Sequence, residues 1–333
     1  MTKKEQLQAI LKERILILDG AMGTMIQRPK LEEEDFRDHP NLKEHPKSLK
    51  GNNDLLSITR PEIIKDIHRQ YFAAGADLAE TNTFSSTTIA QADYGLEEWV
   101  YELNYQSAKL AKEAAVEFST PEKPRFVVGS IGPTNRTASI SPDVNNPAFR
   151  AVTFDELRIA YKQQAEALID GGADILMVET VFDTLNAKAA LFAIHEASQE
   201  KEVEIPIMVS GTITDASGRT LSGQTPEAFL ISIGHMPLLS VGFNCALGPV
   251  QLKPHLQAIN GKSNFFVSAH PNAGLPNEFG EYDLDPKTMA QQVKPYIDEG
   301  LVNILGGCCG TTPEHIREMA ELVEGYYSSW VAL

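Results

Sequence analysis

The sequence has little cysteine, few basic residues and no long apolar run. No stretch of about 18 apolar residues occurs, which excludes a membrane-spanning helix. The first residues are positively charged, but Glu13 and Arg14 interrupt the apolar stretch that follows, so no secretory signal is predicted. Lys and Arg number 29 against 45 Asp and Glu, and the formal net charge of −16 disfavours nucleic acids and anionic membranes as partners. We therefore expect a cytoplasmic protein.

The three cysteines all lie in glycine-rich segments that follow short apolar runs. Cys245 comes after the run 238–243, and the neighbours Cys308 and Cys309 come after the run 302–305. Taken alone, Cys245 is most simply interpreted as a small buried hydrophobic residue. A disulfide between two neighbouring cysteines would be strained and is not expected without a secretory signal. Taken together, the three thiolates predict one bound Zn²⁺ with its fourth position open to water or substrate.

Short apolar runs alternate with longer amphipathic stretches along the chain, a pattern typical of repeated β-strand and α-helix units. Eight such units in 333 residues favour a closed (β/α)8 TIM barrel, an α/β fold, over a doubly wound open sheet. We treat 1–333 as one barrel domain with the zinc site at the carboxyl ends of the strands. The predicted strands are 15–18, 77–80, 126–131, 174–179, 207–211, 239–243, 265–269 and 302–305. The predicted helices are 61–74, 97–117, 153–170, 184–200, 226–235, 249–259, 285–300 and 313–326, with long loops at 27–55 and 134–152.

Polar residues follow several of the predicted strands. Asp19 is followed by Gly20 and Ala21, whose backbone amides can bind a carboxylate, although the segment lacks the glycine spacing of a dinucleotide site. A glutamate closes the second strand and another, Glu179, closes the fourth. Glu179 can hold an ammonium group together with Asp19. Local capping or salt bridging remains the alternative for each acid. His270, after the seventh strand, is interpreted as a hydrogen-bonded wall residue rather than a metal ligand.

These groups together favour alkyl transfer to sulfur. Three thiolates make a bound Zn²⁺ a net anionic centre that is poor at generating hydroxide, so hydrolysis is disfavoured. The same centre can bind an incoming thiol and remove its proton at neutral pH. A pocket that also binds a carboxylate and an ammonium group predicts a small amino-acid thiol as substrate, and L-homocysteine is the natural candidate.

Long segments of the sequence resemble known enzymes. The segments 18–27, 75–84, 242–248 and 306–316 resemble the zinc-dependent homocysteine S-methyltransferases, and 49–56, 89–97 and 217–225 are similar to the amino-terminal module of cobalamin-dependent methionine synthases. The resemblance implies a barrel that binds zinc through Cys245, Cys308 and Cys309, with the homocysteine sulfur in the fourth position. It further implies that Asp19 and Glu179 hold the amino group of the substrate. The substrate carboxylate would be held by the backbone amides of Gly20 and Ala21. Asn244 is predicted to lie at the substrate position or to occupy the fourth zinc position before substrate arrives.

The resemblance also implies the methyl donor. Methylcobalamin would be the proximal donor, replenished from methyltetrahydrofolate, and both would be bound by further modules of the same full-length protein. No folate, cobalamin or activation module is recognised in the sequence, so we expect an excised homocysteine-binding module. Three alternatives remain: a homocysteine methyltransferase that uses S-adenosylmethionine, S-methylmethionine or betaine, a zinc-binding thiol sensor without catalysis, and a redox protein with a Cys308–Cys309 disulfide.

Overall fold

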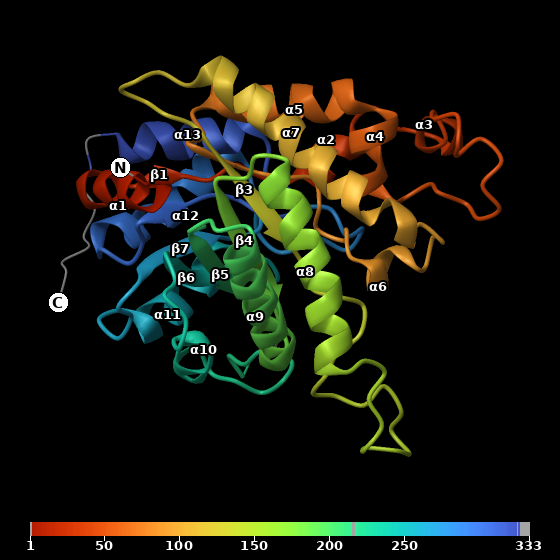
Figure 1. The fold of residues 1–333 in the computed structure, drawn as a ribbon. Coiled ribbons are helices and arrows are strands. Elements are labelled where there is room, and N and C mark those ends of the chain that lie inside the picture. The colour runs from red at the N-terminus through yellow and green to blue at the C-terminus, as the bar shows by residue number, and fades with distance from the viewer. Residues whose placement is uncertain (1, 215–216, 325, 327–333) are drawn as a thin grey trace.

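Eight parallel strands form the centre of the molecule (Figure 1). The computed structural model describes residues 2–214, 217–324 and 326. The strands are ordered β1-β8-β7-β6-β5-β4-β3-β2, and a bridge between Leu18 and Leu78 joins the two ends of the sheet. The sheet therefore closes into the predicted (β/α)8 TIM barrel. The strands are β1 Leu16–Ile17, β2 Leu78–Glu80, β3 Phe126–Ile131, β4 Ile175–Val181, β5 Ile207–Gly211, β6 Ser240–Asn244, β7 Phe266–His270 and β8 Ile304–Leu305.

The large helices lie outside the barrel (Figure 1). Seven of them connect successive strands, and α13 follows the last strand. Several of them begin at a residue whose side chain caps the helix: Thr153 and Thr225 accept hydrogen bonds from backbone amides of the first turn, and Asp183 does the same. α5 ends at Gly75, whose φ of 113° is the left-handed conformation that glycine adopts without strain. The helices are α5 Pro61–Ala74, α7 Val100–Phe118, α8 Phe154–Asp170, α9 Thr184–Glu200, α10 Pro226–Ile233, α11 Pro249–Ile259, α12 Pro286–Asp298 and α13 Pro313–Val323. All lie within a few residues of the predicted ranges.

One helix that was not predicted, α1 Lys3–Glu13, covers the end of the barrel at which the strands begin. Leu7 and Leu11 are fully buried and pack with the side chains that fill the barrel interior. Arg14, directly after α1, makes two hydrogen bonds of 2.8 and 2.9 Å to Asp77, the residue before β2. In Figure 1, α1 lies beside β1, whereas α3 and α6, which follow strand ends, lie on the other side of the barrel. The inward-facing residues in this layer are Leu16, Leu18, Leu78, Phe126, Val128, Ile175, Met177, Met208, Leu239, Phe266 and Ile304.

The long loops after β1 and β3 differ in structure. The first contains the short elements α2 Met22–Gln27, α3 Glu33–Phe36, η1 Asn53–Leu55 and α4 Leu56–Thr59, and the loop after β2 adds α6 Thr88–Gln91 and η2 Glu97–Trp99. Glu33 organises the first loop, because its carboxylate accepts hydrogen bonds from the backbone amides of Leu49 and Lys50. Residues 134–152 form no helix or strand and project beyond the start of α8 (Figure 1). In the described part of the chain, no helix is long and apolar enough to cross a membrane.

Candidate metal and substrate site

The three cysteines lie at the ends of β6 and β8, on either side of β7. The end of β7 fixes both segments, since the Cys245 amide donates to the His270 carbonyl (3.2 Å) and the Cys308 amide donates to the Pro271 carbonyl (2.9 Å). Cys245 and Ala246 have φ values of 59° and 56°, a left-handed conformation that is uncommon for residues with a side chain. Such backbone strain occurs chiefly where the surrounding structure holds a functional group in place.

The sulfur atoms are close enough to share one metal ion. All three Sγ atoms lie within 4.8 Å of one another, and those of Cys245 and Cys309 are 3.7 Å apart. Two sulfurs bound to a tetrahedral Zn²⁺ at about 2.3 Å are about 3.8 Å apart, so the spacing fits a zinc centre. All three cysteines are free, and none is in a disulfide.

The pKa values of the thiols are set by their contacts with one another. Hydrogen bonds from Cys245 and Cys308 lower the pKa of Cys309 to about 3. Conversely, hydrogen bonding to Cys245 and Cys309, together with burial, raises the pKa of Cys308 well above its usual value. Without a cation the cluster therefore keeps protons on part of its sulfurs, whereas a metal ion allows all three to be thiolates.

Three carboxyl groups lie near the cysteines. Asp19 follows β1, Glu80 ends β2 and Glu179 lies in β4. Asp19 is 2% exposed, and its Oδ2 accepts a hydrogen bond from the Glu80 amide (3.1 Å), while its buried Oδ1 has no hydrogen-bond partner among the described residues. Burial raises the pKa of Asp19 and Glu80 well above their usual values and that of Glu179 to about 7. The Glu179 carboxylate accepts hydrogen bonds from the hydroxyls of Ser130 and Thr180.

A bulge in β4 sets the direction of the Glu179 side chain. The register between β4 and β5 shifts by one residue between Val178 and Val181, and Thr180 inside this bulge has a φ of 54°. Asn244 holds the bulge: its Oδ1 accepts from the Thr180 amide (3.1 Å) and its Nδ2 donates to the Thr180 hydroxyl (2.8 Å). The same Nδ2 lies 3.9 Å from the Cys308 sulfur. Asn244 thus connects the position of Glu179 to that of a cysteine.

One cavity of about 720 Å³ contains these groups. Six of the residues predicted from the sequence line it: Gly20, Ala21, Glu179, Cys245, Cys308 and Cys309. The other two, Asp19 and Asn244, are buried and are not among the lining residues. The Ala21 amide is already engaged, because it donates to the Thr311 hydroxyl (3.1 Å). His270 also lines the cavity, with a pKa lowered to about 3 by burial, and its Nε2 has no hydrogen-bond partner in the described part of the chain.

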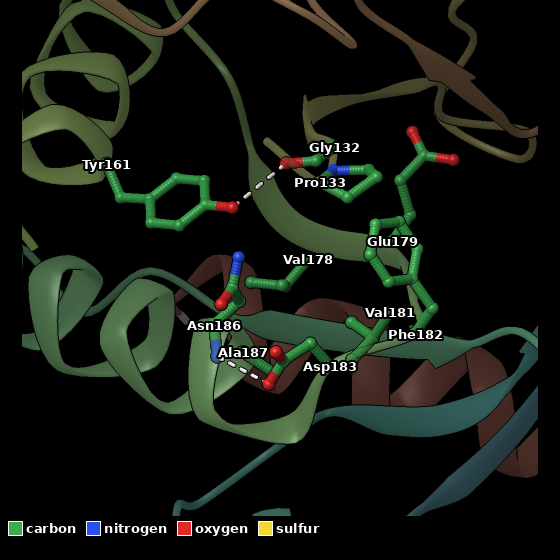
Figure 2. A pocket seen from close by; sticks show the side chains of 10 residues that line it. All are labelled: Gly132, Pro133, Tyr161, Val178, Glu179, Val181, Phe182, Asp183, Asn186 and Ala187. Atoms are coloured by element: carbon green, nitrogen blue, oxygen red, sulfur yellow. Dashed lines mark hydrogen bonds between the residues drawn. The ribbon is translucent and has the colours of Figure 1, made fainter. Parts of the chain in front are cut away.

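Figure 2 shows the other side of Glu179, where a pocket of about 10 Å³ lies between β4 and α9. The Glu179 carboxylate points away from Tyr161 and Asn186 in this view, and the Tyr161 hydroxyl donates to the Gly132 carbonyl (3.3 Å). A volume of this size is enough for about one water molecule, so no substrate fits there. The large cavity is the candidate site.

Sequence reasoning assigned no role to four groups of this site. Glu80 and Tyr282 line the cavity, and Ser130 and Thr180 hydrogen bond to Glu179. Ser130 is two residues after the inward-facing Val128, so the alternation of side chains along a strand is a signal that could have found it. Glu80 carried the same signal as Glu179, an acid that closes an apolar strand.

Comparisons with known proteins agree with this geometry. Residues 16–323 match the family model described as homocysteine S-methyltransferase. The fold is similar to that of the homocysteine methyltransferase MmuM from Escherichia coli in its metallated form, with 23% identity, a TM-score of 0.72, and coverage of 95% of this chain and 99% of that chain. The oxidized form of the same protein matches with 22% identity, a TM-score of 0.73, and coverage of 95% and 98%. Because the family model matches most of the sequence, the chain belongs to the homocysteine S-methyltransferase family and is a methyltransferase.

Proposed function

We propose that the protein catalyses zinc-dependent methyl transfer to L-homocysteine, giving methionine, with methylcobalamin as the proximal donor. The observation that carries this proposal is the meeting of three thiols with the carboxyl groups of Glu80 and Glu179 at one cavity, with the buried Asp19 bonded to the Glu80 amide. The thiols suit a metal that activates sulfur, and the carboxyl groups suit the ammonium group of an amino acid. Family membership supports homocysteine as the thiol.

Cys245, Cys308 and Cys309 would hold the zinc. When bound, Zn²⁺ lowers the pKa of a thiol so that the sulfur is ionised at neutral pH. Asp19 and Glu179 bind the substrate ammonium group, and the unpartnered Oδ1 of Asp19 accepts one of its protons in a hydrogen bond. Asn244 keeps Glu179 and Cys308 in register, so that the ammonium group and the reacting sulfur are fixed together. For the substrate carboxylate, the Gly20 amide is the better candidate, because Ala21 already donates to Thr311.

The size of the cavity and the exposed apolar side chains at its mouth support a large donor. The cavity is several times larger than homocysteine, and Phe84 on its wall is 41% exposed. Leu275 and Phe279, 51% and 79% exposed, lie in the loop that also supplies Tyr282 to the cavity. Exposed apolar side chains around an opening are typical of a docking site. We assign them to methylcobalamin carried by a cobalamin-binding module of the same full-length protein, with methyltetrahydrofolate as the ultimate donor.

A sulfonium compound is the second candidate for the methyl donor. The residues that line the cavity provide the groups that would bind such a cation. Asp54, Tyr94 and Tyr282 line the wall together with Phe84, and none of the described lining residues is Lys or Arg. Aromatic rings and a carboxylate stabilise a cationic methyl donor such as S-methylmethionine or S-adenosylmethionine. The quaternary ammonium of betaine fits the same description.

Spectral conversion of methylcobalamin by homocysteine tests the proposal. The zinc-loaded chain should demethylate methylcobalamin and form methionine, and the Cys308→Ala variant should be slower by more than about tenfold, because the metal site is lost. A loss below tenfold in that variant with unchanged homocysteine binding would contradict the zinc-thiolate mechanism. If the wild-type chain binds zinc and homocysteine but leaves methylcobalamin intact, S-methylmethionine is tested as the donor. Methionine formed from it would support the sulfonium donor. Zinc and homocysteine binding with no turnover on either donor would indicate a thiol sensor.

A further inference from the structure

Asp54 is a buried acid on the wall of the large cavity. It lines the cavity although the residue is only 5% exposed. Its Oδ2 accepts two hydrogen bonds of 2.7 Å, from the Ser85 amide and from the Ser86 hydroxyl. Its Oδ1 has no hydrogen-bond partner, and the carboxylate no ion pair, among the described residues. One oxygen is therefore held by the protein, and the other is available to a ligand in the cavity.

The charge of this acid favours a ligand that brings a hydrogen-bond donor. Burial raises the pKa of Asp54 to about 6, so the group is largely ionised at neutral pH. No Lys or Arg is among the described residues that line the cavity, so the wall supplies no cation to balance it. A buried carboxylate oxygen without a donor is unfavourable, and a ligand N–H group that reaches it removes this penalty.

Hydrogen bonds fix the wall around this acid before a ligand arrives. The Asn52 Nδ2 donates to the Gln91 Oε1 (2.7 Å), and the Gln91 Nε2 donates to the Asn52 Oδ1 (3.2 Å). The same Nε2 also donates to the Ser85 carbonyl (3.0 Å). The segments 49–56 and 89–97, which carry part of the sequence resemblance, therefore hold each other in place. The free carboxylate oxygen is a preorganised acceptor, which suits specific recognition.

We propose that Asp54 is a specificity-determining residue for the methyl donor, whose N–H group it binds through Oδ1. This inference rests on the proposed function, in which Asp19, Glu179 and the three cysteines bind homocysteine. None of those residues hydrogen bonds to Asp54 in the described part of the chain, and the cavity of about 720 Å³ is several times larger than homocysteine. Both candidate donors carry an N–H group: methylcobalamin has amide side chains on its corrin ring, and S-methylmethionine has an ammonium group.

Asp54→Asn turns the acceptor into a donor with little change of shape. The Ser85 amide can only donate, so the Asn carbonyl oxygen must face it, and the Asn NH₂ group then faces the cavity. The KM of the methyl donor should rise about tenfold or more, whereas the Kd of homocysteine should stay within about twofold of that of the wild type. Glu281→Gln is the matched control, because Glu281 lines the same cavity but is exposed. It should change the KM of the methyl donor by less than about twofold.

Initial rates of methionine formation by the zinc-loaded protein give the KM of methylcobalamin and of S-methylmethionine, and calorimetry gives the Kd of homocysteine. The donor that the wild type uses identifies the N–H group as a corrin amide or an ammonium group. An unchanged donor KM in Asp54→Asn would overturn the inference. Equal weakening of homocysteine and donor would also overturn it, because Asp54 would then support the site as a whole. Both outcomes leave the proposed function intact, whereas a wild type that uses neither donor would refute that function and the inference with it.

Discussion

Asn244 offers the sharpest test of how the site is built. Its side chain is fully buried and hydrogen bonds to the Thr180 amide (3.1 Å), the Thr180 hydroxyl (2.8 Å) and the Ser210 hydroxyl (2.7 Å), in addition to its contact with the Cys308 sulfur (3.9 Å). It is the connection that holds the left-handed residue of β4 against β6. Asn244→Ala should therefore destabilise the protein and also loosen the metal site.

The size of the effect follows from the groups left behind. A buried polar group that loses its partner costs about 1–3 kcal/mol. The Ser210 hydroxyl can rotate toward another acceptor, and the Thr180 hydroxyl still donates to Glu179. The Thr180 amide is fixed by the backbone, so the expected loss of unfolding free energy is about 2–5 kcal/mol. Ser210→Ala is the matched control: it removes a single bond and leaves Asn244 held by Thr180, and should cost about 1 kcal/mol.

Urea unfolding of the metal-free proteins measures both values without a contribution from zinc binding. A separate titration should show weaker zinc binding in Asn244→Ala, by about tenfold or more, since groups that orient a metal ligand contribute this much. If Asn244→Ala is no less stable than Ser210→Ala and binds zinc as tightly as the wild type, then Asn244 does not organise the site and the reasoning is wrong.

Three other predictions concern the scaffold. Gly242→Ala should abolish folding, because a Cβ there would lie 1.7 Å from the Ser268 carbonyl oxygen. Gly23→Ala is the control and should fold, because a Cβ there meets no atom within 4 Å. Soluble yield and circular dichroism measure the difference between the two variants. Leu11→Ala should lower the unfolding free energy by about 3 kcal/mol in urea, and the exposed Glu13→Ala should leave it unchanged. Burial lowers the pKa of His68 to about 4, so the unfolded chain binds the proton more strongly and stability falls as the pH drops from about 6.5 toward 4, by about 3 kcal/mol. His68→Leu should remove this part of the pH dependence, and unchanged dependence would refute the assignment.

The eight strands could be predicted because buried parallel strands have a strong local signal. Each is a short apolar run that follows a helical stretch, and glycine at 75 marks one such transition. α1 was missed because Leu7 and Leu11 were considered only as a possible signal segment. Their spacing is that of a helix face, but the surface they cover is formed by residues far away in the sequence.

The clustering of the cysteines was also predictable, since strand ends meet at one edge of a barrel. The structure does bring Cys245, Cys308 and Cys309 together, within 4.8 Å. The bulge at Thr180 could not be predicted, because a β-branched residue in a strand gives no sign of a left-handed conformation. That Glu80 and Glu179 line the same cavity depends on the relative depth of β2 and β4 in the barrel, which the sequence of either strand leaves open.

The helix that seals one end of the barrel has a consequence for kinetics. α1 and the apolar layer beneath it block the end at which the strands begin, and the cysteines and acids face the opposite opening. A small substrate held at that depth must enter before the bulky donor that we propose covers the mouth. Its methylated product can then leave only after that donor has departed. The enzyme should therefore follow a compulsory order, with homocysteine first on and methionine last off.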